Sequence, residues 1–193
     1  MVIVFFNSCD KGKNEPPTDP RTYDAGVVIN GIKWATRNVD APGAFVANPK
    51  DIGMYYQWNK KKAWPLMGTI TDWDTSAPEG DTWEKDNDPC PKGWRVPTYD
   101  ELQSLMEANS EWTTIPAEGR IFGSGNNTIF LPITWYREDT DGSPGTIGAN
   151  GNYWSSRLAG NNIYAYDFYF NSNILGWFTL SLNYGLCIRC VAE

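Results

Sequence analysis

Short apolar runs separated by turn residues make up most of the chain, and they predict strands. Val27–Ile29 and Ile32–Trp34 are two such runs, and Asn30-Gly31 lies between them. An Asn-Gly pair between two β-rich runs favours a type I′ turn, because both central residues of that turn need a positive φ. The sequence therefore predicts a β-hairpin at the start of the domain.

One segment has the periodicity of a helix instead. Apolar residues recur there at i, i+3 and i+4, which predicts one buried helix face: Leu102, Leu105 and Met106. Thr98 precedes Glu101 by three positions, the spacing of a reciprocal capping box. We therefore predict a helix that begins after Thr98, and we interpret Asp100 and Glu101 as capping groups rather than catalytic acids.

Further strands are predicted by runs of alternating or continuous apolar residues. They are Gly53–Trp58, Ile129–Pro132, a strand restarting at Tyr153, Ile163–Phe170, Trp177–Leu182 and a last strand, Leu186–Val191. Many short strands with one clear helix indicate an α+β fold.

Two long segments carry no regular pattern. Ala63–Asn87 contains Trp64, Trp73 and Trp83 among turn residues. Three tryptophans argue against disorder. They could either pack over the sheet or form an exposed aromatic platform, and we favour packing. Arg137–Asn152 is rich in glycine and is the most polar loop of the chain.

Composition narrows the classes of function. At 193 residues the chain is long enough for one domain with its own core, which we place at residues 24–193. The net charge of −7 argues against a nucleic-acid partner. The chain has no histidine, which excludes imidazole catalysis and His-ligated zinc. None of the 23 acidic residues is singled out as a catalytic pair, so we expect a protein that is not an enzyme.

The N-terminus resembles the leader of a bacterial lipoprotein. Residues 1–8 are mostly apolar, and Phe6-Asn7-Ser8-Cys9 is similar to a lipoprotein signal-peptidase site. That resemblance implies cleavage before Cys9 and lipidation of its sulfur. The apolar run is short and no basic residue precedes it, so we interpret residues 1–8 as a partial signal peptide; a fortuitous cysteine is the alternative. Residues 9–23 are polar and proline-rich, which predicts a tether.

Three cysteines remain if Cys9 carries a lipid: Cys90, Cys187 and Cys190. Within an extended strand, Cys187 and Cys190 lie an odd number of positions apart and point to opposite faces, so they do not pair easily. We predict a Cys90–Cys190 disulfide, with a Cys90–Cys187 pair as the alternative. Cys187 is then a buried free thiol.

Several segments together resemble the Fibrobacter succinogenes major paralogous domain family. They are GVVINGIKWATRNVD, GMYYQWN, WEKDNDPCPKGWRVPTYDELQSL, IFLP, GNYWSS and GLCIRCV, and the match spans Ala25–Glu193. The resemblance implies an exported outer-membrane lipoprotein that faces the periplasm or the cell surface. It also implies a C-type lectin-like fold with mostly antiparallel short strands, one or two helices, long irregular loops and neighbouring N- and C-terminal strands.

The same resemblance points to a ligand surface. In C-type lectins the ligand is held by the long loop and the next strand, which correspond here to Trp135–Asn152 and Tyr153–Ser156. The EPN or QPD triplet of calcium-dependent lectins is missing, so we expect no cofactor. Asp139 and Asp141 are weak candidates for calcium ligands, and a solvated loop is preferred. Aromatic faces flanked by hydrogen-bonding groups suit a glycan or a peptide, and our candidates are Trp135, Tyr136, Arg137, Asn152 and Trp177.

We therefore expect a surface-anchored, monomeric recognition module for glycan or protein ligands, which meets the membrane only through its lipid. A structural subunit of a surface appendage is the alternative. An oxidase similar to the formylglycine-generating enzymes is a weaker one, because it needs a redox pair of cysteines. Cys187 and Cys190 are the only close pair, and the predicted disulfide argues against that role.

Overall fold

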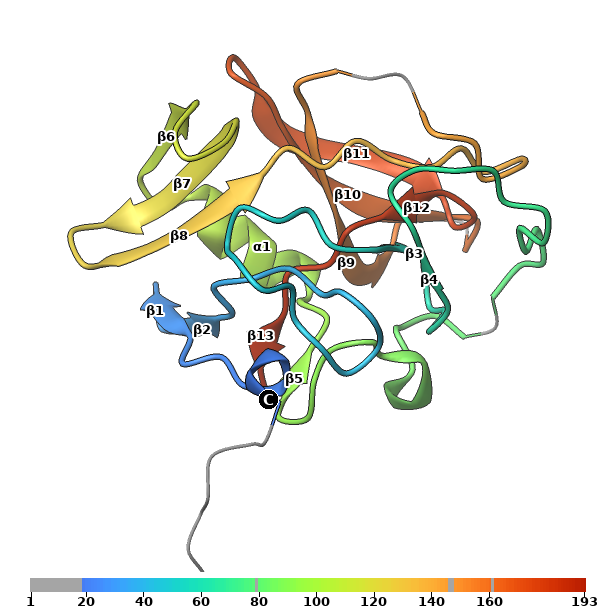
Figure 1. The fold of residues 1–193 in the computed structure, drawn as a ribbon, viewed down its shortest axis with the longest axis horizontal. Helices are drawn as coiled ribbons and strands as arrows, with labels where there is room; N and C mark the ends of the chain where they lie inside the picture. The colour runs from blue at the N-terminus through green and yellow to red at the C-terminus, as the bar shows by residue number, and fades with distance from the viewer. Residues whose placement is uncertain (1–18, 79, 146–147, 161) are drawn as a thin grey trace, which may run out of the picture.

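The computed structural model describes residues 19–78, 80–145, 148–160 and 162–193 (Figure 1). The strands are β1 Val27–Ile29, β2 Ile32–Trp34, β3 Tyr55–Gln57, β4 Ala63–Trp64, β5 Trp94–Arg95, β6 Ser110–Thr113, β7 Gly119–Ser124, β8 Asn127–Pro132, β9 Gly151–Leu158, β10 Tyr164–Phe170, β11 Leu175–Ser181, β12 Gly185–Leu186 and β13 Val191–Ala192. The helix is α1 Tyr99–Met106, and two 3₁₀ turns are η1 Pro20–Thr22 and η2 Lys85–Asn87. These elements confirm the predicted α+β class with short strands.

Among the described residues the strands form four small sheets, in the orders β1-β2-β13-β5, β11-β10-β9, β12-β3-β4 and β6-β7-β8. All of the paired strands within them run antiparallel. The predicted hairpin is confirmed: β1 and β2 pair with Ile29 opposite Ile32, and Asn30 and Gly31 have φ of 50° and 81°. β13 pairs with β2, so the first and last strands of the domain share one sheet.

The predicted helix and its cap are also confirmed. Thr98 Oγ1 accepts a hydrogen bond from the Glu101 amide at 3.2 Å, and Glu101 Oε2 accepts one from the Thr98 amide at 2.8 Å. Glu101 also forms an ion pair with Arg95 at 2.6 Å. Leu102 and Leu105 are buried. The Glu101 carboxylate is therefore fully engaged in capping and in holding β5.

The predicted last strand, Leu186–Val191, is wrong as a continuous element. β12 pairs with β3 and β13 pairs with β2, so the intervening residues cross from one sheet to another. Every residue from 185 to 191 is buried. A continuous apolar run fits a core crossing as well as a strand, and here the crossing is held by Arg189, which donates to Ala35 O and Phe130 O, both at 3.1 Å.

The cysteines follow the prediction. Cys90 and Cys190 form a disulfide across a sequence separation of 100 residues, and Cys187 is a buried free thiol. The bond ties the chain before β5 to the chain before β13. The disulfide therefore joins the middle of the sequence to its last strand.

Two buried clusters form the core, and the tryptophans of the long irregular segment belong to them. Trp64 and Trp83 are buried and Trp73 is partly buried. These tryptophans therefore pack against the core, as predicted, and do not form an exposed platform. No helix in the described ranges is long and apolar enough to cross a membrane.

The predicted leader and the lipidation site at Cys9 lie outside the described residues. Of the predicted tether, residues 19–23 are described, and they are held against the domain. The Phe45 amide donates to Arg21 O at 2.7 Å, and Arg37 donates to the carbonyl of Tyr23.

Candidate functional site

Two loops that are distant in sequence are joined by the side chain of Arg137. Its guanidinium is fully buried and donates to Pro65 O at 2.6 Å, to Gly68 O at 3.4 Å and to Gly142 O. Its backbone is fixed as well, through two hydrogen bonds with Gly185 at 2.9 and 3.0 Å. Arg137 therefore ties loop 65–70 to loop 137–145 and to the start of β12.

Trp73, three residues after loop 65–70, makes a second connection to loop 137–145. Its Nε1 donates to Asp139 O at 3.1 Å, and its ring packs 5.0 Å from that of Trp64. The ring also covers Gly142, where an added Cβ would meet Trp73 Cε3 at 2.4 Å. A side chain at position 142 would therefore force the loops apart.

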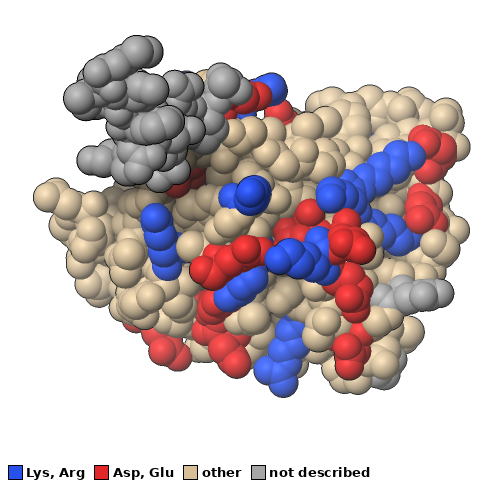
Figure 2. Space-filling model, turned by 90° about the horizontal axis from the view of Figure 1, so that it is seen from below, with Lys and Arg blue, Asp and Glu red and all other residues tan. Residues whose placement is uncertain are grey.

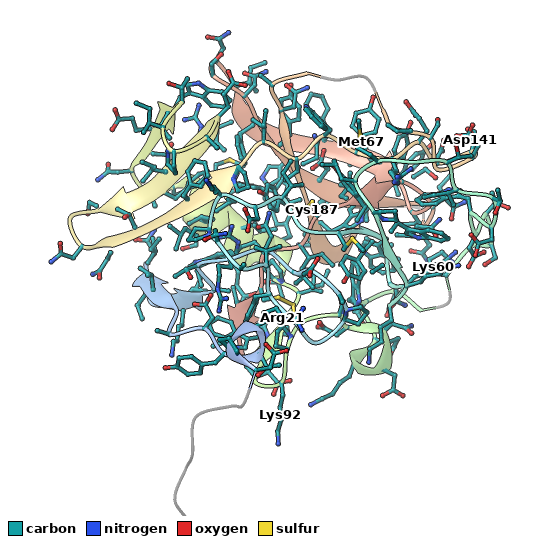
Figure 3. All side chains as sticks on the ribbon, in the orientation of Figure 1. Arg21, Lys60, Met67, Lys92, Asp141 and Cys187 are labelled. Carbon is teal, nitrogen blue, oxygen red and sulfur yellow. A yellow bond between two sulfur atoms is a disulfide. The ribbon has the colours of Figure 1, made fainter. Side chains whose placement is uncertain are left out.

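Between these loops lies an open hollow of about 360 Å³, which we name the paired-loop hollow; its lining residues are Met67, Gly68, Thr69, Ile70, Asp141, Ser143 and Pro144. Met67 is 58% exposed. Asp141 accepts a hydrogen bond from the Ser143 amide at 2.8 Å, and this bond lowers the pKa of the Asp141 carboxyl. Met67 and Asp141 lie in the same upper right part of the molecule (Figure 3). The site thus combines an apolar wall with a carboxylate that is ionised at neutral pH.

A larger hollow of about 700 Å³ lies beside Lys60, Lys61 and Lys62. Two of these lysines are paired within the protein: Lys60 with Asp74 at 2.8 Å and Lys62 with Asp72 at 2.5 Å. The charges of Lys60 and Lys62 are therefore offset by nearby carboxylates. For this reason we take the paired-loop hollow, and not this surface, as the candidate site.

The five predicted ligand residues do not share one surface. Trp135 and Asn152 come together, with Asn152 Nδ2 donating to Trp135 O at 3.3 Å, and Asn152 is buried. Tyr136 packs against Tyr184, with ring centroids 5.6 Å apart. The guanidinium of Arg137 faces protein carbonyls instead of solvent.

Trp177 lies apart from this group, against the helix. Its ring stacks on Tyr99 at 4.2 Å, and its Nε1 donates to Gln103 Oε1 at 2.8 Å. Its polar atom therefore has a protein partner, and the side chain holds β11 on α1.

The two predicted metal ligands have other contacts. Asp139 holds Trp73 through its carbonyl, and Asp141 accepts from Ser143. Within the described ranges, no three Cys, Asp or Glu side chains gather in a way that could hold a metal ion.

Sequence reasoning missed Met67, Ile70 and Pro144, which form the apolar wall of the hollow. They lie about 70 residues apart in two segments without periodicity, and Arg137 makes them neighbours through bonds spanning 69 and 72 positions. The one signal available was the set of apolar residues in residues 63–70, a stretch without strand or helix periodicity.

The free thiol of Cys187 gives a direct test of the oxidase alternative. The residue is fully buried, Sγ donates to Ile52 O at 3.5 Å, and burial raises the pKa of the thiol. In a Cys9→Ser background, where Cys187 is the one free thiol, we expect no reaction with a thiol reagent at pH 8. One equivalent should react in denaturant. Fast reaction of the native protein, or copper(I) binding at Cys187, would contradict this expectation.

Comparison with protein-family models, curated proteins and solved structures returned no significant match for the chain. The class of protein is therefore described from the fold and the site alone. It is an α+β domain of short antiparallel strands whose long loops are fixed by buried side chains.

Proposed function

We propose that this protein is a surface-anchored bacterial lipoprotein that acts as a non-enzymatic recognition module. The observation that carries the proposal is the fixation of the two long loops by Arg137 and Trp73. Loops of this length are costly to order on binding, and prior fixation removes that cost. The paired-loop hollow between them is then a preformed site for a glycan or a protein ligand.

The C-type lectin-like fold is part of the proposal. Three observations support it: the first and last strands share a sheet, the capped helix follows the cysteine that bonds to the last strand region, and a long polar loop precedes β9. Each of these features is expected from the family resemblance of the sequence. Lipidation at Cys9 would place the module on the outer membrane.

The chemistry of the hollow suggests what it takes. Met67, Ile70 and Pro144 offer an apolar wall, and Asp141 offers a carboxylate at the rim. A ligand fits both the wall and the carboxylate if it carries an apolar face next to a hydroxyl or a cation. A sugar ring and a peptide with a basic side chain both have this arrangement.

Glycan and protein arrays probed with the full chain at low micromolar concentration test the proposal. We expect at least one class of ligand to be retained, and Met67→Lys to weaken it by about tenfold or more, because the lysine fills the hollow and pairs with Asp141. Ile163→Lys is the matched control, since Ile163 is also about half exposed, at 54%, and does not line the hollow.

Two results would count against the proposal. Silence of a folded sample on both arrays would reject recognition as the function. A ligand bound equally well by the wild type and by Met67→Lys would reject the paired-loop hollow as its site.

A further inference from the structure

β11 is the outer strand of the sheet β11-β10-β9 (Figure 1). It pairs with β10 in unbroken register, from Tyr164 opposite Ser181 to Phe170 opposite Leu175. In the described part of the chain, no backbone hydrogen bond joins β11 to any strand except β10. The outward N–H and C=O groups of β11 therefore form an open hydrogen-bonding edge.

The other sheet edges carry the usual protection against pairing. β1, β4, β5 and β12 have three residues or fewer, β6 contains Glu111, and β8 ends at Pro132. The far side of β9 is bonded to the core crossing, where the Trp154 amide donates to Cys187 O at 3.1 Å. Short length, charge, proline and coverage are the devices by which proteins block edge pairing.

β11 has none of these devices. It is seven residues long, LGWFTLS, with no charge, no proline and no shift of register against β10. Phe178, in the middle of the strand, is 51% exposed. Such a strand is a template for one more strand.

The sequence around β11 is also uncharged, and the acid opposite Phe178 on β10, Asp167, is buried. No Asp, Glu, Lys or Arg occurs from Phe168 to Ile188, although the whole chain has a net charge of −7. Acidic and basic side chains gather on the face that Figure 2 shows, seen from below. Two identical copies can therefore bring their β11 edges together without placing like charges opposite each other.

β11 is held rigidly enough to act as a template. Trp177 fixes it to α1 through its stacking on Tyr99 and its hydrogen bond to Gln103. On the other face, Phe178 packs edge-on against Tyr169, with ring centroids 4.7 Å apart. Little conformational freedom is lost when such a strand gains a partner.

We propose that two copies of this chain associate by antiparallel pairing of their β11 strands around a two-fold axis. The two three-stranded sheets then become one continuous sheet, and the central Phe178 side chains lie near the axis. A second copy is the occupant because an antiparallel pair of identical strands is self-complementary, as an isologous interface requires. This dimer replaces the monomer expected from the sequence, and it does not depend on what the paired-loop hollow binds.

Analytical ultracentrifugation of the full chain in non-ionic detergent tests the dimer. We expect a reversible dimer over a range of about 1 to 100 μM, with a Kd that Phe178→Lys weakens by about tenfold or more, since it sets two lysines against each other. Met67→Lys is the matched control and leaves the Kd unchanged, because Met67 is similarly exposed but lies in the paired-loop hollow. Added salt should strengthen the dimer, because each copy has a net charge of −7.

Hydrogen exchange of the wild type keeps the test independent of any variant. The outward amides of Leu175–Ser181 should exchange more slowly in a concentrated sample than in a dilute one. A wild type that stays monomeric overturns the proposal. So does a dimer whose β11 amides are not protected, or one that Phe178→Lys leaves intact.

Discussion

Replacement of Arg137 by methionine is expected to lower the free energy of unfolding by about 1–3 kcal/mol. The change leaves the carbonyls of Pro65, Gly68 and Gly142 without their donor. Gly142 is buried, and a buried carbonyl without a partner costs about 1–3 kcal/mol, whereas Pro65 and Gly68 are exposed and their carbonyls can turn to water. Methionine keeps much of the volume of the arginine stem, so the loss reports the hydrogen bonds and not a cavity. Urea unfolding followed by tryptophan fluorescence measures it.

Arg157→Met is the control for this prediction. Arg157 has a side chain that is 59% exposed, and its one ion pair, with Asp100, is at 3.9 Å. The change there should stay within about 0.5 kcal/mol of the wild type, as for other surface substitutions. Equal unfolding midpoints for Arg137→Met and Arg157→Met would contradict the assignment of Arg137 as the side chain that fixes the loops.

Removal of the disulfide is expected to cost about 4–5 kcal/mol, because the bond closes a loop of about 100 residues in the unfolded chain. The double variant Cys90→Ala and Cys190→Ala should unfold at a much lower urea concentration than the wild type. Its midpoint should not respond to reductant, whereas reductant should move the wild type towards the variant.

The control for this prediction is Cys9→Ser, which changes a cysteine without touching the disulfide. Its unfolding midpoint should match that of the wild type with and without reductant. A double variant as stable as the wild type would show that the denatured chain gains little freedom when the bond is lost.

The features predicted correctly from the sequence obey local or covalent rules. The hairpin follows from the φ preferences of Asn30 and Gly31, and the helix start follows from Thr98 and Glu101, three positions apart. The Cys90–Cys190 bond follows from a choice among few cysteines. In each case the information lies within a few residues or in a small number of pairings.

The features that were missed depend on contacts between distant segments. Arg137 and Arg189 look like surface groups in the sequence, yet both are fully buried and satisfied by carbonyls, and Arg189 reaches Phe130 O across 59 positions. The segment around Arg189 is apolar on both sides, so its pattern does not separate a strand from a core crossing. The paired-loop hollow was missed for the same reason, because Arg137 assembles it from two segments that no periodicity connects.

The residues near the chain ends and those of the paired-loop hollow lie in different parts of the domain. Arg21, close to where the described chain begins, and Lys92, beside the last strand, lie at the bottom of the view, whereas Met67 and Asp141 lie at the upper right (Figure 3). A support attached on the N-terminal side would therefore hold the domain by its lower end. Met67 and Asp141, which line the paired-loop hollow, would then lie in the part of the domain away from that support.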